Sequence, residues 1–205
     1  MVNTKSLVLL GLLTAILIIF SVTPIGTIPI GELSITLNII PVAIAAIALG
    51  PGGGAAMGAV FGILSFLQCL GIGISSGMGA VLFSINPFLA FIQRFIPRVL
   101  DGFLVGLVYQ FLENRIGHGP ASFIAGFLSA FLNTVFFMSA LILLFGNTEY
   151  MQGLINGRNV LVFICVFVGV NAILEWILSP LVVGGVSTAL YKARLLPLKA
   201  EGKEK

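Results

Sequence analysis

Ionisable side chains are rare in the apolar stretches of this sequence, and three of them share one helical face. Arg94 and Arg98 are four residues apart, and Asp101 follows three residues later. On an α-helix this spacing points all three side chains the same way. Two neighbouring guanidinium groups offer two-point hydrogen bonding to a carboxylate or phosphate. The spacing therefore predicts an anion-binding face, or else an ion pair between Arg98 and Asp101 within the helix.

Two later apolar stretches carry polar side chains at a similar depth. Asn133 and Asn171 each lie about twelve residues, or roughly 18 Å of helix, from the end that we expect to share a side with Arg94. Glu175 follows one turn after Asn171. We expect these helices to enclose a small-molecule cavity with apolar walls and a few polar groups, although the asparagines could instead bond between helices. The predicted lining is Gln68, Asn86, Arg94, Arg98, Asn133, Asn171 and Trp176.

The composition identifies the kind of element that positions these groups. Of 205 residues, 59% are hydrophobic and 8% are charged, whereas a soluble domain has about 25% charged residues. The hydrophobic residues are enough for about six membrane-spanning helices of roughly 20 residues each. This composition excludes a water-soluble enzyme, a disordered chain and a nucleic-acid binder, despite a pI of about 9.1. It also leaves no room for a soluble ATPase domain.

The predicted fold is an all-α membrane protein of six transmembrane helices. Breaks rich in Gly and Pro separate the apolar segments, and the second is short enough to be tilted or buried in protein. Seven Lys and Arg residues lie on one predicted side and three on the other, so we expect both termini in the cytoplasm. Residues 1–192 form one domain, and 193–205 form a short basic tail. The predicted spans are about 6–23, 37–49, 54–70, 91–113, 120–145 and 159–191.

Small residues recur at helical spacing on several predicted spans. Gly54, Gly58 and Gly62 lie on one face, and Gly11 and Ala15 are spaced in the same way on the first span. Membrane helices associate closely where such stripes occur. We predict that both stripes bind a partner membrane protein, and packing inside the bundle is the alternative.

Enzyme motifs in the sequence are incomplete. The glycine run 50–54 lacks the Gly-Lys-Ser/Thr of a phosphate loop. Residues 73–77 fit Gly-x-Ser-x-Gly, but the sole histidine, His118, is predicted to lie in a solvated loop across the membrane, too far away to activate a serine. Two cysteines in apolar runs give no metal spacing. A proton-coupled carrier that uses Glu175 and Asp101 remains an alternative.

Five stretches resemble the substrate-binding S components of energy-coupling factor (ECF) vitamin transporters. They are 34–41, 49–55, 58–62, 95–98 and 133–135, and the resemblance covers about residues 5–192. It implies a six-helix bundle in the bacterial plasma membrane that captures a vitamin from outside and is not an enzyme. The vitamin then crosses as the S component topples against a shared module of one membrane protein and two ATPases. ATP is used by those partners, and no cofactor is expected on this chain.

Within that family the sequence is most similar to the pantothenate-specific type. The run Ser34-Ile-Thr-Leu, the Pro97-Arg98 pair and Asn133 carry the similarity. It implies a ligand whose carboxylate meets Arg94 or Arg98, and a pocket that includes the outer loops 25–36 and 70–90. Types specific for hydroxymethylpyrimidine, pyridoxine, riboflavin or folate remain alternatives. The family docks through a small-residue motif on its first helix, which corresponds here to Gly11 and Ala15.

Overall fold

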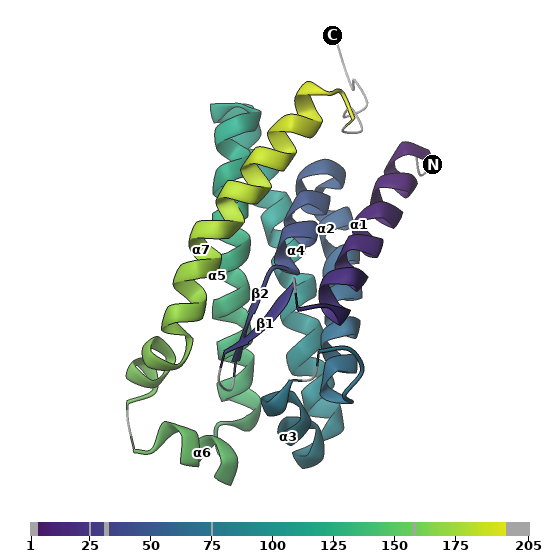
Figure 1. Ribbon diagram of the computed structural model, residues 1–205. Coiled ribbons are helices and arrows are strands. Elements are labelled where there is room, and N and C mark those ends of the chain that lie inside the picture. Colours follow the sequence, from purple (N-terminus) through teal and green to yellow (C-terminus); the bar gives the residue numbers. More distant parts are fainter. Residues whose placement is uncertain (1–3, 25, 31–32, 75, 158, 196–205) are drawn as a thin grey trace.

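The computed structural model describes residues 4–24, 26–30, 33–74, 76–157 and 159–195. Over these residues the chain forms an elongated bundle of long helices with one β-hairpin, and α1 begins at the same end of the bundle at which α7 finishes (Figure 1). The elements in chain order are α1 (Thr4–Val22), β1 (Thr27–Ile30), β2 (Leu33–Thr36), α2 (Ile39–Cys69), α3 (Gly77–Ile85), α4 (Pro87–Ile116), α5 (His118–Phe145), α6 (Glu149–Ile155) and α7 (Val160–Lys192).

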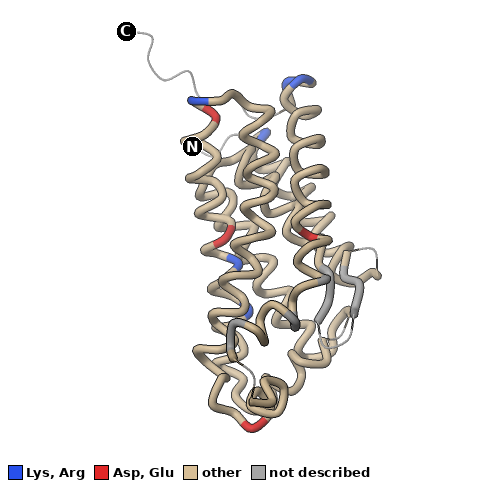
Figure 2. The backbone as a smooth tube through the Cα atoms, turned by 90° about the vertical axis from the view of Figure 1, so that its left-hand side faces the viewer, with Lys and Arg blue, Asp and Glu red and all other residues tan. Residues whose placement is uncertain are grey.

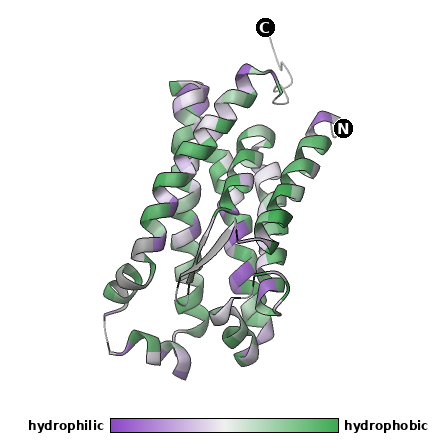
Figure 3. Ribbon diagram, viewed as in Figure 1, coloured by the Kyte–Doolittle hydropathy of each residue, from purple (hydrophilic) through white to green (hydrophobic). Residues whose placement is uncertain are grey.

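The outer faces of the long helices are apolar. Five helices among the described residues are long and apolar enough to cross a membrane: α1, α2, α4, α5 and the part of α7 from Asn171 to Lys192. Large hydrophobic side chains are exposed along them, such as Leu143 at 83% and Phe88 at 70%, and hydrophobic residues dominate the outer ribbon faces (Figure 3). Such an apolar surface would lead to aggregation in water, whereas it is stable in contact with lipid chains. The predicted helical membrane protein is therefore confirmed, and the structure adds one β-hairpin to the helices.

Helix α2 consists of two arms that fold back on one another at Gly50. Gly50 has φ 74° and ψ −169°, a conformation that glycine adopts without a steric penalty, and Pro51 begins the second arm, where no amide donor is needed. An added Cβ on Gly54 would lie 2.8 Å from the Cβ of Ala46, although eight residues along a straight helix would separate them by about 12 Å. The first arm, 39–49, is about 16 Å long and buried almost throughout. It corresponds to the second predicted span, which lies inside the protein and is too short to cross the membrane.

The second arm of α2 packs directly against α4 through the glycine stripe. Added Cβ atoms on Gly54 and Gly58 would collide with the carbonyl oxygens of Gly102 and Arg98, and one on Gly62 would lie 2.8 Å from the Cα of Phe95. The stripe therefore allows two backbones to touch within one molecule. The prediction that Gly54, Gly58 and Gly62 bind a partner protein is wrong, because α4 of the same chain covers that face.

Helix boundaries otherwise follow the predicted segments, and charged residues mark one end of the bundle. Lys and Arg positions gather at the end where α1 begins and α7 finishes, and only a few charges lie within the bundle (Figure 2). Helix α7 stops at Lys192, the predicted domain limit, and the tail beyond residue 195 lies outside the described residues. The sequence did not predict the hairpin, in which Thr27 pairs with Thr36 and Ile30 with Leu33, or the short helices α3 and α6.

Candidate functional site

A cavity of about 90 Å³ lies between α2, α4, α5 and α7. A single buried water needs roughly 10–15 Å³, so the cavity is large enough for a small organic molecule. Its apolar lining includes Phe61, Phe137, Met138, Val168 and Ala172. Its polar lining is Thr36, Ser65, Gln68, Ser76, Arg94, Arg98, Asn133, Thr134, Asn171 and Glu175.

Arg98 is a buried cation that has no ion-pair partner among the described residues. Its side chain is 5% exposed, and its guanidinium carbon lies 5.2 Å from the ring centre of Phe61 and 4.7 Å from that of Phe137. Its Nε and Nη1 atoms are buried without a hydrogen-bond partner. Asp101 instead accepts a hydrogen bond from Ser129 at 3.1 Å, and no ion pair joins it to Arg98 in the described part of the chain. The alternative of an internal Arg98–Asp101 pair is therefore wrong.

Arg94 lies beside Arg98 and is held by two hydroxyl groups. Its Nη2 donates to Ser76 Oγ at 3.1 Å and its Nη1 to Ser65 Oγ at 3.5 Å. The side chain is 7% exposed, and its guanidinium carbon lies 5.2 Å from the ring centre of Phe137. Arg94 thus points into the protein and does not extend to lipid head groups. Neither serine supplies a negative charge, so these two hydrogen bonds leave the guanidinium of Arg94 without an anionic partner of its own among the described residues.

Three amide side chains of the predicted lining reach the same cavity from α2, α5 and α7. Gln68 donates to the carbonyl of Ser21 at 3.0 Å, which ties the end of α2 to the end of α1. The Oδ1 atom of Asn133 is buried and has no hydrogen-bond partner. Asn171 is buried on the α7 wall. The predicted convergence of Arg94, Arg98, Asn133 and Asn171 on one cavity is confirmed as geometry, and their contact with a ligand stays a prediction.

Glu175 also lines the cavity, although the predicted lining omitted it. Its Oε1 atom accepts a hydrogen bond from the backbone amide of Thr36 at 2.7 Å, so the carboxylate joins α7 to the end of β2. The signal was present in the sequence, because Glu175 is an acid one helical turn from Asn171. Ser65, Ser76 and Phe137 were also missed, because hydroxyl and aromatic residues are too common in apolar segments to indicate a site.

Two predicted residues lie outside the cavity lining. Asn86 caps α4, where its Oδ1 accepts the amide hydrogen of Leu89 at 3.1 Å. Trp176 packs on α5, with ring centres 6.1 Å from Phe127 and 5.5 Å from Phe131. The structure therefore gives Asn86 a capping role and Trp176 a packing role.

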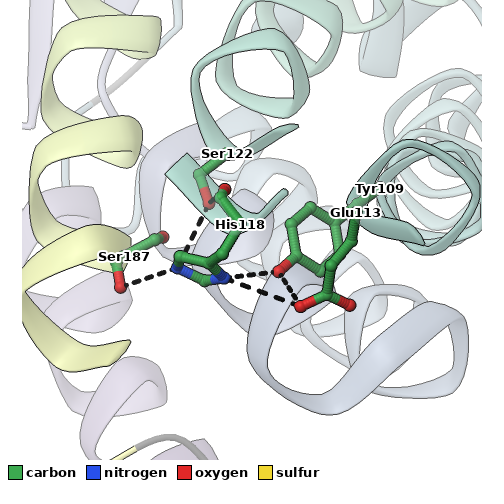
Figure 4. Close-up of polar contacts among 5 residues, drawn as sticks. All are labelled: Tyr109, Glu113, His118, Ser122 and Ser187. Carbon is green, nitrogen blue, oxygen red and sulfur yellow. Dashed lines mark hydrogen bonds and ion pairs between the residues drawn. The ribbon is translucent and has the colours of Figure 1, made fainter. Parts of the chain in front are cut away.

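A second buried polar cluster surrounds His118 (Figure 4), where α4 ends and α5 begins, whereas both arginines of the cavity lie in the first half of α4. His118 is 9% exposed and stacks on Tyr191 with ring centres 4.2 Å apart. The expectation that it is a solvated loop residue is wrong. Ser76 lies in the other half of the bundle, beside Arg94, so His118 cannot serve it as a catalytic base. Ser75 lies outside the described residues.

The hydrogen bonds around His118 form a continuous chain. Tyr109 donates its hydroxyl proton to Glu113 at 2.8 Å and lies 2.6 Å from Nδ1 of His118. The Nε2 atom faces the backbone carbonyl of Ser187 at 3.1 Å, and Ser122 donates its own proton to the carbonyl of His118. Each ring nitrogen of His118 therefore has a polar contact, Nδ1 with the hydroxyl of Tyr109 and Nε2 with the carbonyl of Ser187. The cluster therefore joins α4, α5 and α7.

An apolar bundle with a buried polar cavity defines an integral membrane protein with a site for a small molecule. A match to a known protein family identifies the kind of membrane protein more closely. Residues 5–187 match the model of the family described as "ECF transporter, substrate-specific component". The chain belongs to this family, and with its apolar helices it is a multi-pass protein of the bacterial plasma membrane.

Two curated bacterial proteins are similar over most of the chain. A pantothenic acid transporter, PanT, of Lactococcus lactis subsp. cremoris is 32% identical over 174 residues, covering 78% of this chain and 79% of the relative. A pantothenate transporter, PanT, of Leuconostoc mesenteroides subsp. mesenteroides is 31% identical over 197 residues, covering 92% of this chain and 93% of the relative. The family expectation from the sequence is confirmed.

Proposed function

We propose that this chain is the pantothenate-binding S component of an ECF-type importer. The observation that carries the proposal is the guanidinium of Arg98 in the cavity lining, whose Nε and Nη1 atoms are buried without a hydrogen-bond partner among the described residues. A buried charge without a partner is costly, and a carboxylate ligand would remove that cost. Two relatives at about this chain's length are named for pantothenate or pantothenic acid, and this vitamin carries a carboxylate.

The remaining groups of pantothenate suit the rest of the cavity. The vitamin has a central amide and two hydroxyl groups, and Asn133 and Asn171 offer both hydrogen-bond donors and acceptors. Asn133 Oδ1 lacks a hydrogen-bond partner in the part of the chain that the structure describes, so a ligand N–H or O–H would satisfy it. In this proposal Arg98 and Arg94 hold the carboxylate, and the two asparagines hold the amide and hydroxyl groups.

The proposed transport step depends on partner proteins. Gly11 and Ala15 are exposed on the surface of α1, and nothing lies within 4 Å of an added Cβ on Gly11. This small-residue face is available for the coupling protein that the family resemblance implies. The cluster of Lys and Arg at the end that holds the start of α1 supports a cytoplasmic position for that end. The cavity would then open outward, and toppling driven by ATP hydrolysis in the partner ATPases would deliver the vitamin.

Binding is tested by titration calorimetry of the purified chain in detergent. Pantothenate, pyridoxine, riboflavin, folate and hydroxymethylpyrimidine form the panel. We expect saturable binding of pantothenate alone. Saturable binding of another vitamin and not of pantothenate would reassign the substrate, and no binding of any would end the proposal.

Transport by the chain alone is tested separately in liposomes. The S-component proposal predicts pantothenate uptake only with the coupling protein, both ATPases and internal ATP. Uptake by the chain alone under a proton gradient, lost in Glu175→Gln, would support the alternative of a secondary carrier.

A further inference from the structure

The cavity contains a cation and an anion from different helices that do not pair with one another. Arg98 of α4 and Glu175 of α7 are each 5% exposed, and both line the cavity. No ion pair within 4.0 Å joins them in the part of the chain that the structure describes. Buried opposite charges are stable when they approach closely, and keeping them apart leaves both desolvated. Their separation points to a ligand with different chemistry at its two ends.

The carboxylate of Glu175 is suited to a hydrogen-bond donor. An ionised carboxylate only accepts hydrogen bonds, and it would repel a ligand carboxylate. The Thr36 amide at 2.7 Å fixes its Oε1 atom, so an incoming hydroxyl meets an acceptor that is already oriented. Val168 and Ala172 line the cavity from the same helix, which gives that wall an apolar surface beside the acid.

We propose that Glu175 is a specificity-determining residue that binds the hydroxyl end of the ligand while Arg98 binds its acid end. The inference rests on the proposed function and adds the orientation of the ligand. In pantothenate the carboxylate and the hydroxyl groups lie at opposite ends, and two methyl groups stand between the hydroxyls. These methyl groups would face Val168 and Ala172, and the central amide would lie near Asn133. A carboxylate–Arg98 contact and a hydroxyl–Glu175 contact together fix one direction for the bound vitamin.

The orientation is tested by pairing protein variants with ligand analogues. One analogue is pantothenol, in which a primary alcohol replaces the carboxylate. The other is 2-deoxypantothenate, which lacks the hydroxyl next to the amide. The variants are Arg98→Met and Glu175→Gln, and Glu149→Gln is the matched control, since Glu149 is exposed on α6. Affinities are measured by calorimetry, and thermal unfolding confirms that each variant is folded.

The expected result is a crossed pattern of losses. The wild-type chain should bind each analogue about tenfold or more weakly than pantothenate, because each lacks a hydrogen bond to a charged group. Glu175→Gln should distinguish pantothenate from the deoxy analogue less strongly than the wild-type chain does, because its neutral amide oxygen still accepts a hydrogen bond but carries no charge. It should still bind pantothenol more weakly than pantothenate. Arg98→Met should no longer distinguish pantothenate from pantothenol, and it should still bind the deoxy analogue more weakly than pantothenate. Glu149→Gln should have the same affinities as the wild-type chain.

Three outcomes would overturn the inference. If Glu175→Gln discriminates against the deoxy analogue as strongly as the wild-type chain does, Glu175 does not bind the hydroxyl group. If Glu175→Gln loses its discrimination against pantothenol, the ligand lies the other way round. If the wild-type chain binds no pantothenate, the proposed function fails as well, whereas the first two outcomes leave it standing. Should Glu175→Gln not fold, Glu175→Asp repeats the test, because a shortened carboxylate should reduce discrimination against the deoxy analogue alone.

Discussion

The two buried polar clusters of this bundle differ in whether the protein satisfies its own polar groups. Around His118 both ring nitrogens have partners, and the chain of contacts ends on the Glu113 carboxylate. In the cavity, Arg98 Nε and Nη1 and Asn133 Oδ1 are buried without partners. Nearly all buried polar groups in folded proteins are hydrogen-bonded. The Oγ atom of Ser187 is also buried without a partner, but the imidazole of His118 has a partner at both nitrogens, so its cluster holds helices together. The cavity, with its unsatisfied guanidinium and amide groups, is the better candidate for a ligand site.

Arg98→Met should have the largest effect and should separate affinity from stability. Removing one partner of a buried charge pair costs about 2 kcal/mol or more, which is about a 30-fold loss of pantothenate affinity. The unliganded protein should not lose stability, because an apolar side chain replaces an unpaired charge between two aromatic rings. Calorimetry measures the affinity, and thermal unfolding without ligand measures the stability.

An unliganded Arg98→Met protein that unfolds well below the wild-type midpoint would contradict this assignment. It would mean that contacts within the protein already stabilise the guanidinium, as the His118 cluster does for its own groups. The difference between the two clusters would then disappear.

Tyr109→Phe should have the opposite profile. The change removes one hydroxyl and leaves Glu113 and His118 without a shared partner, which costs about 1–3 kcal/mol. The unfolding midpoint should fall while pantothenate affinity stays at the wild-type value. Tyr191→Phe is the matched control, because the ring that stacks on His118 is kept. Reduced affinity in Tyr109→Phe at unchanged stability would show that the two clusters are coupled.

Gly58→Ala tests whether the glycine stripe supports the cavity. The added methyl group would meet the backbone of Arg98, and overpacking of this kind costs about 1–3 kcal/mol. Because α4 carries both arginines, we expect lower stability together with weaker pantothenate binding. Gly11→Ala is the control, because an added Cβ there has no neighbour within 4 Å. Equal behaviour of the two variants would contradict the close packing of α2 on α4.

The sequence predicted the helical segments and the convergence of Arg94, Arg98, Asn133 and Asn171, because both follow from periodicity and from the cost of polar groups in lipid. It could not decide which face of a small-residue stripe is covered, since Gly58 and Gly11 look alike until the neighbouring helix is placed. The prediction that His118 lies in a solvated loop was wrong, because a Gly-His-Gly-Pro sequence is typical of such a loop and gives no sign of the helices that bury it. Partners distant in sequence, such as Ser187 for His118 and Thr36 for Glu175, leave no local signal.

Asn86→Ala should have the smallest effect, and it distinguishes two asparagines that the sequence placed in one site. Asn86 caps α4 and lies outside the cavity lining, so its loss should cost about 1 kcal/mol of stability and leave pantothenate affinity unchanged. Asn133→Ala should weaken binding and leave stability nearly unchanged, since Oδ1 has no partner to lose. Calorimetry and thermal unfolding of both variants compare the two roles directly. If Asn86→Ala weakened binding as much as Asn133→Ala, the site would extend to the start of α4, beyond the cavity that the structure shows.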